Sequence, residues 1–260
     1  MAGPLLQPLL LLLLSFALGS AGQEGLHPAQ DTGERIINGV SCPRGSHPWQ
    51  VALYDNDEFH CAGVLLNQQW VLTVAHCRLS EYIVQMGSDL LVDGNVQRIW
   101  ATQYFVHPRY NNSNYNHDIM LVKLSSPATL SPTVSTIDLP SSCKDPGTSC
   151  TVSGWGVTTG HAAATNPSEL MCSNVNIISY QECQQSYRNL LKKYMLCAVP
   201  PDGLSNSCTG DSGNPLVCEG SLQGLVSSGY FPCILPFAPV TYTRLCMYRK
   251  WVYKTMKANS

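Results

Sequence analysis

A serine occurs in a glycine-rich string, Ser212 within Thr-Gly-Asp-Ser-Gly-Asn-Pro at residues 209–215. Glycines allow a tight turn that exposes the hydroxyl and leaves backbone N–H groups free to face an oxyanion. A serine hydroxyl is a weak nucleophile at neutral pH, so it needs a histidine base, and that base needs a carboxylate. His76, in Ala-His-Cys, and Asp118, in His-Asp-Ile, supply both. Together these three residues indicate covalent catalysis by a serine.

The elements that must position these side chains are short apolar and β-branched runs, separated by Gly, Pro, Asn, Asp and Ser. This pattern is typical of an all-β sandwich or barrel and not of alternating strands and helices. The runs lie at residues 49–54, 63–66, 70–74, 119–124, 149–153, 216–218, 222–227 and 240–242. One helix is predicted at the C-terminus, from apolar residues at helical spacing. They are Tyr248, Trp251, Val252, Tyr253 and Met256.

Composition sets the broad class of protein. The chain has 260 residues, of which 44% are hydrophobic and 12% charged, so it can bury a sizeable core. A formal net charge of -2 provides no basic surface for nucleic acid and no polybasic segment for membrane binding. We therefore expect a globular domain, or two closely packed halves, without a nucleic-acid partner.

The N-terminus is typical of an export signal. A leucine-rich run at 5–18 is followed by the small residues Gly19, Ser20 and Ala21, which predicts a signal peptide at 1–21 and a secreted, extracellular protein. The alternative is a membrane anchor, but the run is shorter than the roughly 20 residues needed to span a bilayer. No later stretch is long and apolar enough, so we expect no membrane span.

The twelve cysteines fit an exported chain with disulfide bonds, because the secretory route is oxidising. A zinc cluster would need closely spaced Cys or His ligands, and the sequence has none. We expect no metal and no other cofactor.

The motifs resemble those of the chymotrypsin-type (S1) serine proteases. Besides the three catalytic strings, Ile-Ile-Asn-Gly at 36–39 and Ser-Gly-Trp-Gly at 153–156 carry the resemblance. Residues 45–53 and 87–90 are more narrowly similar to the kallikrein-related peptidases, in particular to a chymotryptic member. The resemblance covers Arg35 to the C-terminus.

The resemblance implies two packed antiparallel Greek-key β-barrels with a C-terminal α-helix. The peptidase domain would span 36–260, with the barrels at about 36–141 and 142–246 and the helix at about 247–258. It also implies a role for each catalytic residue. His76 would act as general base and then acid, Asp118 would orient it, and Ser212 would attack the scissile carbonyl.

Further roles follow from the same resemblance. The N–H groups of Gly210 and Ser212 would form the oxyanion hole, and Ser227 would hydrogen-bond near Asp118. Residues 22–35 would be an activation propeptide.

Activation would begin with a cut after Arg35. The cut would free the α-amino group of Ile36, which would pair with the carboxylate of Asp211 beside the nucleophile. A buried ion pair tolerates the loss of one partner badly, so the cut would control assembly of the site.

The resemblance also implies a pairing for all twelve cysteines, which spacing alone leaves open. The implied pairs are Cys42–Cys172, Cys61–Cys77, Cys143–Cys246, Cys150–Cys218, Cys183–Cys197 and Cys208–Cys233.

The residues implied to form the substrate pocket favour apolar or tyrosine-like side chains. Asn206 occupies the pocket floor, where trypsin-like relatives carry aspartate, and a neutral amide cannot compensate a buried cation. A trypsin-like processing enzyme is therefore disfavoured. Gly229 keeps the pocket mouth open, whereas Val240 replaces a glycine and takes volume, favouring leucine, methionine or smaller residues.

Several residues depart from the family pattern. Ser228 replaces a tryptophan beside the pocket, and Asn214, Val199 and Ala62 replace glycines. A valine cannot follow a glycine with positive φ, so these changes put activity in doubt, but not the fold.

Two functions stay open. The favoured one is a secreted endopeptidase, expected to be a monomer, that meets protein or peptide substrates, protein protease inhibitors and an activating protease. The alternative is a catalytically impaired pseudoprotease that acts as a binding protein.

Surface features add little. Asn111 begins the one N-glycosylation sequon, which can be glycosylated or bare. A calcium site is not supported, because the loop at 88–98 has only Asp89 and Asp93 as carboxylates.

Overall fold

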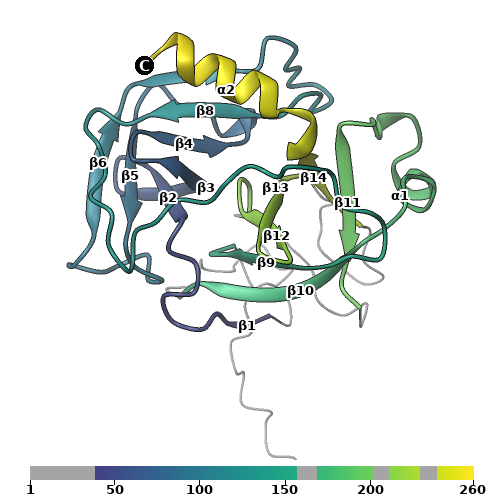
Figure 1. Cartoon of the computed structure of the whole chain (residues 1–260), viewed down its shortest axis with the longest axis horizontal. Helices are drawn as coiled ribbons and strands as arrows, with labels where there is room; N and C mark the ends of the chain where they lie inside the picture. Colours follow the sequence, from purple (N-terminus) through teal and green to yellow (C-terminus); the bar gives the residue numbers. More distant parts are fainter. Residues whose placement is uncertain (1–38, 157–168, 202–210, 229–238) are drawn as a thin grey trace, which may run out of the picture. The chain divides into compact units, whose positions relative to one another are not determined.

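The computed structural model describes residues 39–156, 169–201, 211–228 and 239–260. Two seven-stranded sheets contain its strands (Figure 1). The first sheet has the order β6-β5-β2-β3-β4-β8-β7, and each neighbouring pair is antiparallel. Its strands are β2 (Gln50–Asp55), β3 (Glu58–Asn67), β4 (Trp70–Thr73), β5 (Tyr82–Met86), β6 (Gln97–Ala101), β7 (Gln103–Val106) and β8 (Met120–Lys123). Because β6 and β7 are consecutive in the chain, the two edges of this sheet are directly connected.

Strand β2 shows why these residues form a barrel wall. Successive side chains of a strand face opposite sides, and here both sides are buried. Val51 and Leu53 belong to the large core cluster of the first sheet. Ala52 and Tyr54 belong to a different cluster, which also contains Trp155. Because both faces of β2 are buried, its sequence is a nearly continuous apolar run.

The second sheet has the order β1-β10-β11-β14-β13-β12-β9, and β10 also pairs with β9. Strands β9 to β14 thereby form a closed ring around a second apolar cluster. The strands are β1 (Val40–Ser41), β9 (Ser149–Gly154), β10 (Met171–Ile177), β11 (Met195–Val199), β12 (Pro215–Cys218), β13 (Ser221–Ser228) and β14 (Val240–Arg244). The all-β, two-barrel fold expected from the sequence is confirmed.

Strand β1 belongs to the second sheet, although it lies within the residue range expected for the first barrel. Its residue Val40 pairs with Cys172 on β10, and the backbone N–H of Cys42 donates to Leu170 O at 3.0 Å. The start of the described chain therefore crosses to the second half.

The C-terminal helix α2 spans Arg249–Ala258, close to the expected range, and the 3₁₀ helix η3 (Leu245–Met247) precedes it. Val252 is fully buried in the core cluster of the first sheet. On β8, Lys123 Nζ donates to Asn259 O at 2.6 Å, so α2 lies beside β8, as Figure 1 shows.

A second helix, α1 (Tyr180–Tyr187), was not expected from the sequence. It is short and has a weak apolar face, but it begins with a capping box. Ser179 Oγ accepts from the N–H of Glu182 at 3.1 Å, and the Glu182 carboxylate accepts from the N–H of Ser179 at 2.8 Å. The Ser-x-x-Glu string is a sequence signal that could have found this helix. The 3₁₀ helix η2 (Arg188–Leu190) follows it.

Five disulfides cross-link the described chain, and they are five of the six pairs that the family resemblance implies. They are Cys42–Cys172, Cys61–Cys77, Cys143–Cys246, Cys150–Cys218 and Cys183–Cys197. Both cysteines of the sixth implied pair, Cys208 and Cys233, lie outside the described residues.

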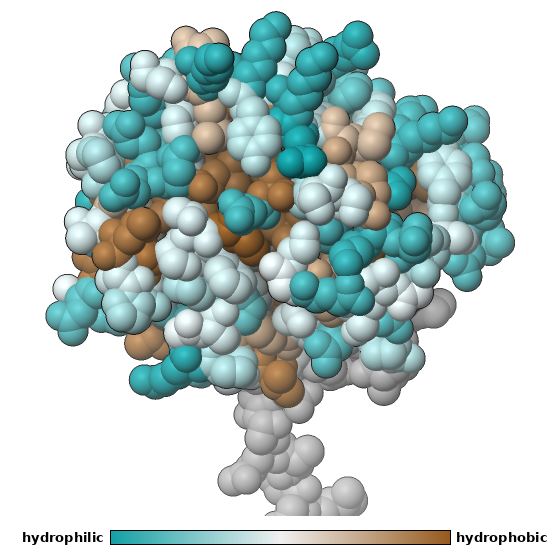
Figure 2. Space-filling view, in the orientation of Figure 1, coloured by the Kyte–Doolittle hydropathy of each residue, from teal (hydrophilic) through white to brown (hydrophobic). Residues whose placement is uncertain are grey.

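On the face drawn in Figure 2, apolar side chains show through in the middle and on the left, among polar ones. Large apolar residues that are exposed lie at separate places in the sequence, such as Val92, Trp100 and Leu130. Within the described ranges, none of the helices has the length and apolar character needed to cross a bilayer.

Candidate active site

The structure brings His76, Asp118 and Ser212 together in one hydrogen-bonded chain. His76 Nδ1 lies 2.7 Å from Asp118 Oδ2, and His76 Nε2 lies 2.8 Å from Ser212 Oγ. The neighbouring carboxylate selects the tautomer with the proton on Nδ1, which leaves Nε2 as an acceptor for the serine hydroxyl. The arrangement is competent for general-base activation of a serine nucleophile.

His76 lies in the 3₁₀ helix η1 (Ala75–Cys77), directly after β4. The next residue, Cys77, forms a disulfide with Cys61 on β3, so His76 is attached to two strands of the first sheet. This linkage limits the motion of the imidazole relative to that sheet.

Asp118 is almost fully buried, with 2% of its surface exposed, and four donors surround it. Besides the imidazole, its carboxylate accepts from the N–H of His76 at 2.9 Å and from Ser227 Oγ at 2.6 Å. Its backbone carbonyl accepts from Thr243 Oγ1 at 2.5 Å. A buried carboxylate that is this well satisfied keeps a fixed orientation. Ser227 contacts Asp118 as expected, whereas sequence reasoning missed Thr243.

The loop before Asp118 contains two residues in the left-handed region, Tyr115 with φ 52° and His117 with φ 53°. Contacts hold His117 in that conformation. Its ring stacks on Tyr194 with centroids 3.9 Å apart, and its Nδ1 lies 3.0 Å from Tyr248 Oη. These aromatic contacts of His117, the residue before Asp118, were also missed, because Tyr194 directly precedes β11 and Tyr248 lies between η3 and α2, both far from His117 in the sequence.

His107 also stacks on His117, with the ring centroids 4.8 Å apart. Burial, with the nearby cationic forms of His117 and Arg109, lowers the pKa of His107 to about 4. Burial likewise lowers the pKa of His117. Both rings are therefore neutral at neutral pH, and one of them belongs to His117, the residue that directly precedes Asp118.

The turn that carries Ser212 is fixed by backbone hydrogen bonds. The carbonyl of Ser212 accepts from the N–H of Ala62 at 2.9 Å, and the N–H of Gly213 donates to Val226 O at 2.9 Å. Gly213 has φ 82°, and a Cβ there would lie 2.0 Å from Ala62 O. Only glycine fits this position.

Asp211, the carboxylate expected to pair with a new N-terminus, is fully buried. Its Oδ1 accepts from the N–H of Gly156 at 3.2 Å and from Asn214 Nδ2 at 2.7 Å. Gly156 belongs to the Ser-Gly-Trp-Gly string, so that string and the serine string meet at this carboxylate.

The residues that replace glycines do not carry the backbone strain that the sequence suggested. Ala62, Val199 and Asn214 all lie in the described part of the chain, and none of them has positive φ. A side chain at these positions is therefore compatible with the local backbone. The argument for impaired activity loses this support.

Ser228, which replaces a tryptophan, lies at the end of β13, with its Oγ 2.7 Å from Thr241 Oγ1. Next to it is a largely apolar cavity of about 280 Å³. Its lining includes Tyr115, Tyr187, Leu190, Met195, Ser228 and Thr241. The ring of Tyr115 lies edge-on to His76, with centroids 5.3 Å apart, so the cavity adjoins His76.

Other expected pocket residues are placed only in part. Val240 begins β14 and is 4% exposed, in the same apolar cluster as Val226 and Tyr242. Asn206, Gly210 and Gly229 lie outside the described residues, as do Arg35 and Ile36.

The loop features have ordinary local roles. Asn111 is exposed, and its Oδ1 accepts from the N–H of Ser113 at 2.8 Å. The carboxylate of Asp89 accepts from Gly45 N at 2.7 Å, and that of Asp93 accepts from Ser88 Oγ at 2.6 Å.

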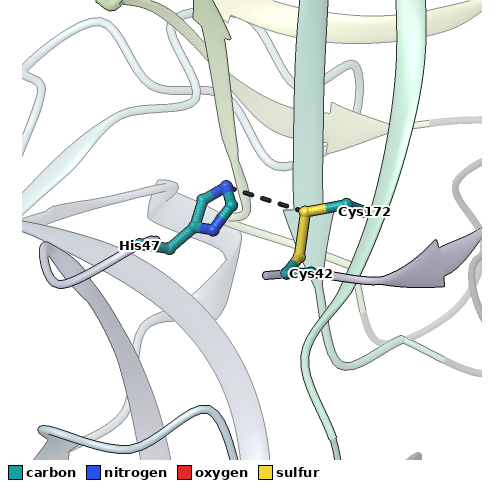
Figure 3. A group of neighbouring side chains, drawn as sticks. All are labelled: Cys42, His47 and Cys172. Atoms are coloured by element: carbon teal, nitrogen blue, oxygen red, sulfur yellow. Dashed lines mark hydrogen bonds between the residues drawn. A yellow bond between two sulfur atoms is a disulfide. The ribbon is translucent and has the colours of Figure 1, made fainter. Parts of the chain in front are cut away.

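Within the described ranges, one group of side chains has the spacing of metal ligands, namely Cys42, His47 and Cys172 (Figure 3). His47 Nε2 lies 3.7 Å from Cys172 Sγ. The two sulfurs are joined in a disulfide, however, and a metal requires thiolates. This group therefore provides no argument for a metal site.

Comparisons with known proteins agree with this geometry. The Trypsin family pattern matches residues 36–252. The chain is similar to human Kallikrein-7, with 53% identity over 99% of both chains, and to rat Cationic trypsin-3, with 43% identity over 89% of this chain and 94% of the relative. A similar solved structure is neuropsin, a serine protease expressed in the limbic system of mouse brain, with a TM-score of 0.79 and 41% identity, covering 84% of this chain and 98% of neuropsin.

The family match spans well over half of the chain, and it includes all three residues of the hydrogen-bonded chain described above. The protein therefore belongs to the trypsin family, as a kallikrein-related serine endopeptidase.

Proposed function

We propose that Ser212, His76 and Asp118 are the catalytic triad of this endopeptidase. The two contacts of 2.7 and 2.8 Å that join them are the observation that carries the proposal. As Ser212 Oγ attacks the carbonyl carbon of the scissile bond, its proton passes to His76 Nε2, and Asp118 stabilises the imidazolium. His76 then gives this proton to the leaving amine, and the acyl-enzyme remains.

Deacylation repeats the sequence with water. His76 takes a proton from the water that attacks the acyl carbonyl, and returns it to Ser212 Oγ as the acid leaves. The N–H groups of Gly210 and Ser212 would stabilise the oxyanion in both halves of the reaction.

A fluorophosphonate probe and a peptide assay test this proposal together. Protein cut after Arg35 is expected to label stoichiometrically and to cleave peptides, whereas Ser212→Ala neither labels nor cleaves. Ser141→Ala, which changes an exposed serine elsewhere, is the matched control and keeps both activities. Labelling of Ser212→Ala, or a cut wild-type protein that folds but stays inert, would contradict the proposal and favour the binding-protein alternative.

Activation by cleavage after Arg35 is part of the proposal. The buried carboxylate of Asp211 next to Ser212 supports it, because a free α-amino group at Ile36 is the cation that the family resemblance provides for this carboxylate. Arg35→Gln is expected to remain uncut by trypsin and to lose most turnover. Turnover equal to that of the cut enzyme in this uncut variant would contradict an insertion mechanism.

The preferred residue before the scissile bond is proposed to be apolar, with leucine, methionine or smaller side chains ahead of large aromatics. Asn206 provides no negative charge for arginine or lysine, and Val240 narrows the pocket. The apolar cavity beside Ser228 would take substrate side chains further from the cut.

Secretion is also proposed, with a signal peptide at 1–21 and a propeptide at 22–35. The five disulfides support an oxidising compartment. We further propose a monomer that an external protease activates and that protein inhibitors control. Asn111, which is exposed, is the proposed glycosylation site.

A further inference from the structure

The side chain of Asn214 contacts the carboxylate of Asp211. Both residues are fully buried, and Asn214 Nδ2 donates to Asp211 Oδ1 at 2.7 Å. A hydrogen bond from an amide to a buried carboxylate is charge-assisted and stronger than one between neutral groups. The residue that replaces a glycine thus contributes a donor at the carboxylate next to the nucleophile.

A relay of hydrogen bonds fixes which way this amide faces. Gln50 Nε2 donates to Asn214 Oδ1 and to Ser153 O, both at 3.0 Å, and Ser153 Oγ donates to Gln50 Oε1 at 2.6 Å. With its oxygen engaged by Gln50, Asn214 presents its NH₂ group to Asp211. Residues from β2, from β9 and from the turn before β12 thus together orient one N–H of Asn214 toward the carboxylate.

Two glycines provide the space that the pair occupies. A Cβ at Gly154 would lie 1.8 Å from Asn214 Nδ2, and one at Gly156 would lie 2.3 Å from Asp211 Oδ1. Any side chain at either position would displace the amide or the carboxylate. The contact is thus part of a cavity shaped to hold both groups.

Backbone hydrogen bonds connect Asp211 and Asn214 to the turn that carries Ser212. The N–H of Asn214 donates to Asp211 O at 3.0 Å, and the N–H of Val226 on β13 donates to Asn214 O at 2.8 Å. Asp211 and Asn214 thus enclose Ser212 and Gly213 in one braced turn. The side-chain contact coexists with the 2.8 Å contact between His76 and Ser212, so it is compatible with an assembled triad.

We propose that Asn214 is a positioning residue that anchors Asp211, and through it Ser212, independently of the α-amino group freed by activation. This inference rests on the proposed function, because it concerns the same nucleophile and the same activation step. The amide is an uncharged donor that is present before the cut. The uncut chain therefore keeps part of the ordered site, and the cut chain depends less on its new N-terminus.

The test compares Asn214→Ala with wild type in two backgrounds, uncut Arg35→Gln and protein cut after Arg35. In the uncut background, Asn214→Ala is expected to lower the rate of fluorophosphonate labelling about tenfold or more, since a lost hydrogen bond to a charged group is worth that factor. In the cut background, the labelling rate is expected to fall less, because the α-amino group still holds Asp211. In peptide cleavage by the cut protein, kcat is expected to fall while KM stays unchanged.

Two further variants make the result specific. Gln50→Ala leaves Asn214 in place but frees its amide, and is expected to cause a smaller loss with the same dependence on the cut. Gln223→Ala removes another buried amide, one that bonds to Ser221 Oγ, and is expected to affect cut and uncut proteins equally. If Asn214→Ala does not fold, Gln50→Ala still decides the question.

If Asn214→Ala lowered the labelling rate by the same factor in cut and uncut protein, Asn214 would serve only stability, and the proposal would be overturned. Faster labelling of the uncut Asn214→Ala protein would overturn it as well, since the amide would then hold an inactive arrangement. The labelling and turnover of cut wild type test the proposed function separately.

Discussion

The two halves of the active site are held in different ways. His76 is attached to the first sheet by the Cys61–Cys77 disulfide, and its backbone N–H donates to Asp118. The hydroxyls of Ser227 on β13 and Thr243 on β14 donate to Asp118 from the second sheet. The turn of Ser212 belongs to the second half, where Asn214 and Ser228 depart from the family pattern.

This difference shows how a substituted catalytic half can keep its geometry. At position 214, asparagine in place of glycine provides an amide that bonds to Asp211 at 2.7 Å. At position 228, serine in place of tryptophan lines a cavity of about 280 Å³. The first change adds a contact, whereas the second changes the shape of the substrate surface. We therefore expect the change at position 214 to affect rate and the change at position 228 to affect specificity.

The largest effect is expected at the junction of the two halves. His76→Ala and Ser212→Ala should each lower kcat about a thousandfold or more, and the double variant should lose little beyond either single change, because the residues act as a unit. Turnover numbers of the three variants on one peptide measure this. Losses that multiply in the double variant would show that the two halves act separately.

The next effect concerns the primary pocket in the second half. Asn206→Asp alone should add little cleavage after arginine or lysine, because Val240 still occupies volume. Combining it with Val240→Gly should raise kcat/KM for cleavage after arginine or lysine at least about tenfold more than the two single changes predict, since neighbouring pocket residues couple. Val240→Gly alone should shift preference from leucine toward phenylalanine and tyrosine.

The measurement for this pair is kcat/KM on peptides that differ only in the residue before the cut. A wild-type preference for arginine would show that the pocket is misassigned. An unchanged ratio of cleavage after aromatic residues to cleavage after leucine in Val240→Gly would show that Val240 is wrongly assigned to the pocket.

A smaller effect is expected when the missing tryptophan is restored. Ser228→Trp should fill the cavity next to Tyr115 and lower kcat/KM roughly tenfold for peptides with bulky apolar residues two to four positions before the cut. Peptides with glycine at those positions are the matched control and should be cleaved as before. Equal losses for both peptide sets would point to a damaged triad instead of a filled subsite.

The smallest effect concerns pH and the first half. His107 has its pKa lowered from 6.5 to about 4 in the folded protein, so the unfolded chain binds more protons between these values. Stability should therefore fall as the pH drops from 6.5 toward 4, and His107→Gln should remove part of that loss. We expect the fall in Tm between pH 7.5 and pH 5 to shrink by about 2 °C in the variant. An identical fall in both proteins would show that His107 titrates normally.

Much of the fold and the site could be predicted from short strings of sequence. The spacing of Trp251, Val252 and Met256 predicts the C-terminal helix, because a single helix face creates its own repeat. The strings around His76, Asp118 and Ser212 predict their chemistry, since each requires particular residue types in a fixed local setting. These features are local, and a local pattern is visible without the fold.

Only the tertiary structure decided which distant groups meet. It paired β1 with the second sheet, placed Thr243 on the carbonyl of Asp118, and gave His117 its aromatic supports. From sequence, Asn214 is only a lost glycine. In the fold it donates to Asp211 and accepts from Gln50, a residue 164 positions away. Hydrogen bonds depend on distance and direction in space, so residues far apart in the sequence acquire such roles only when the chain has folded.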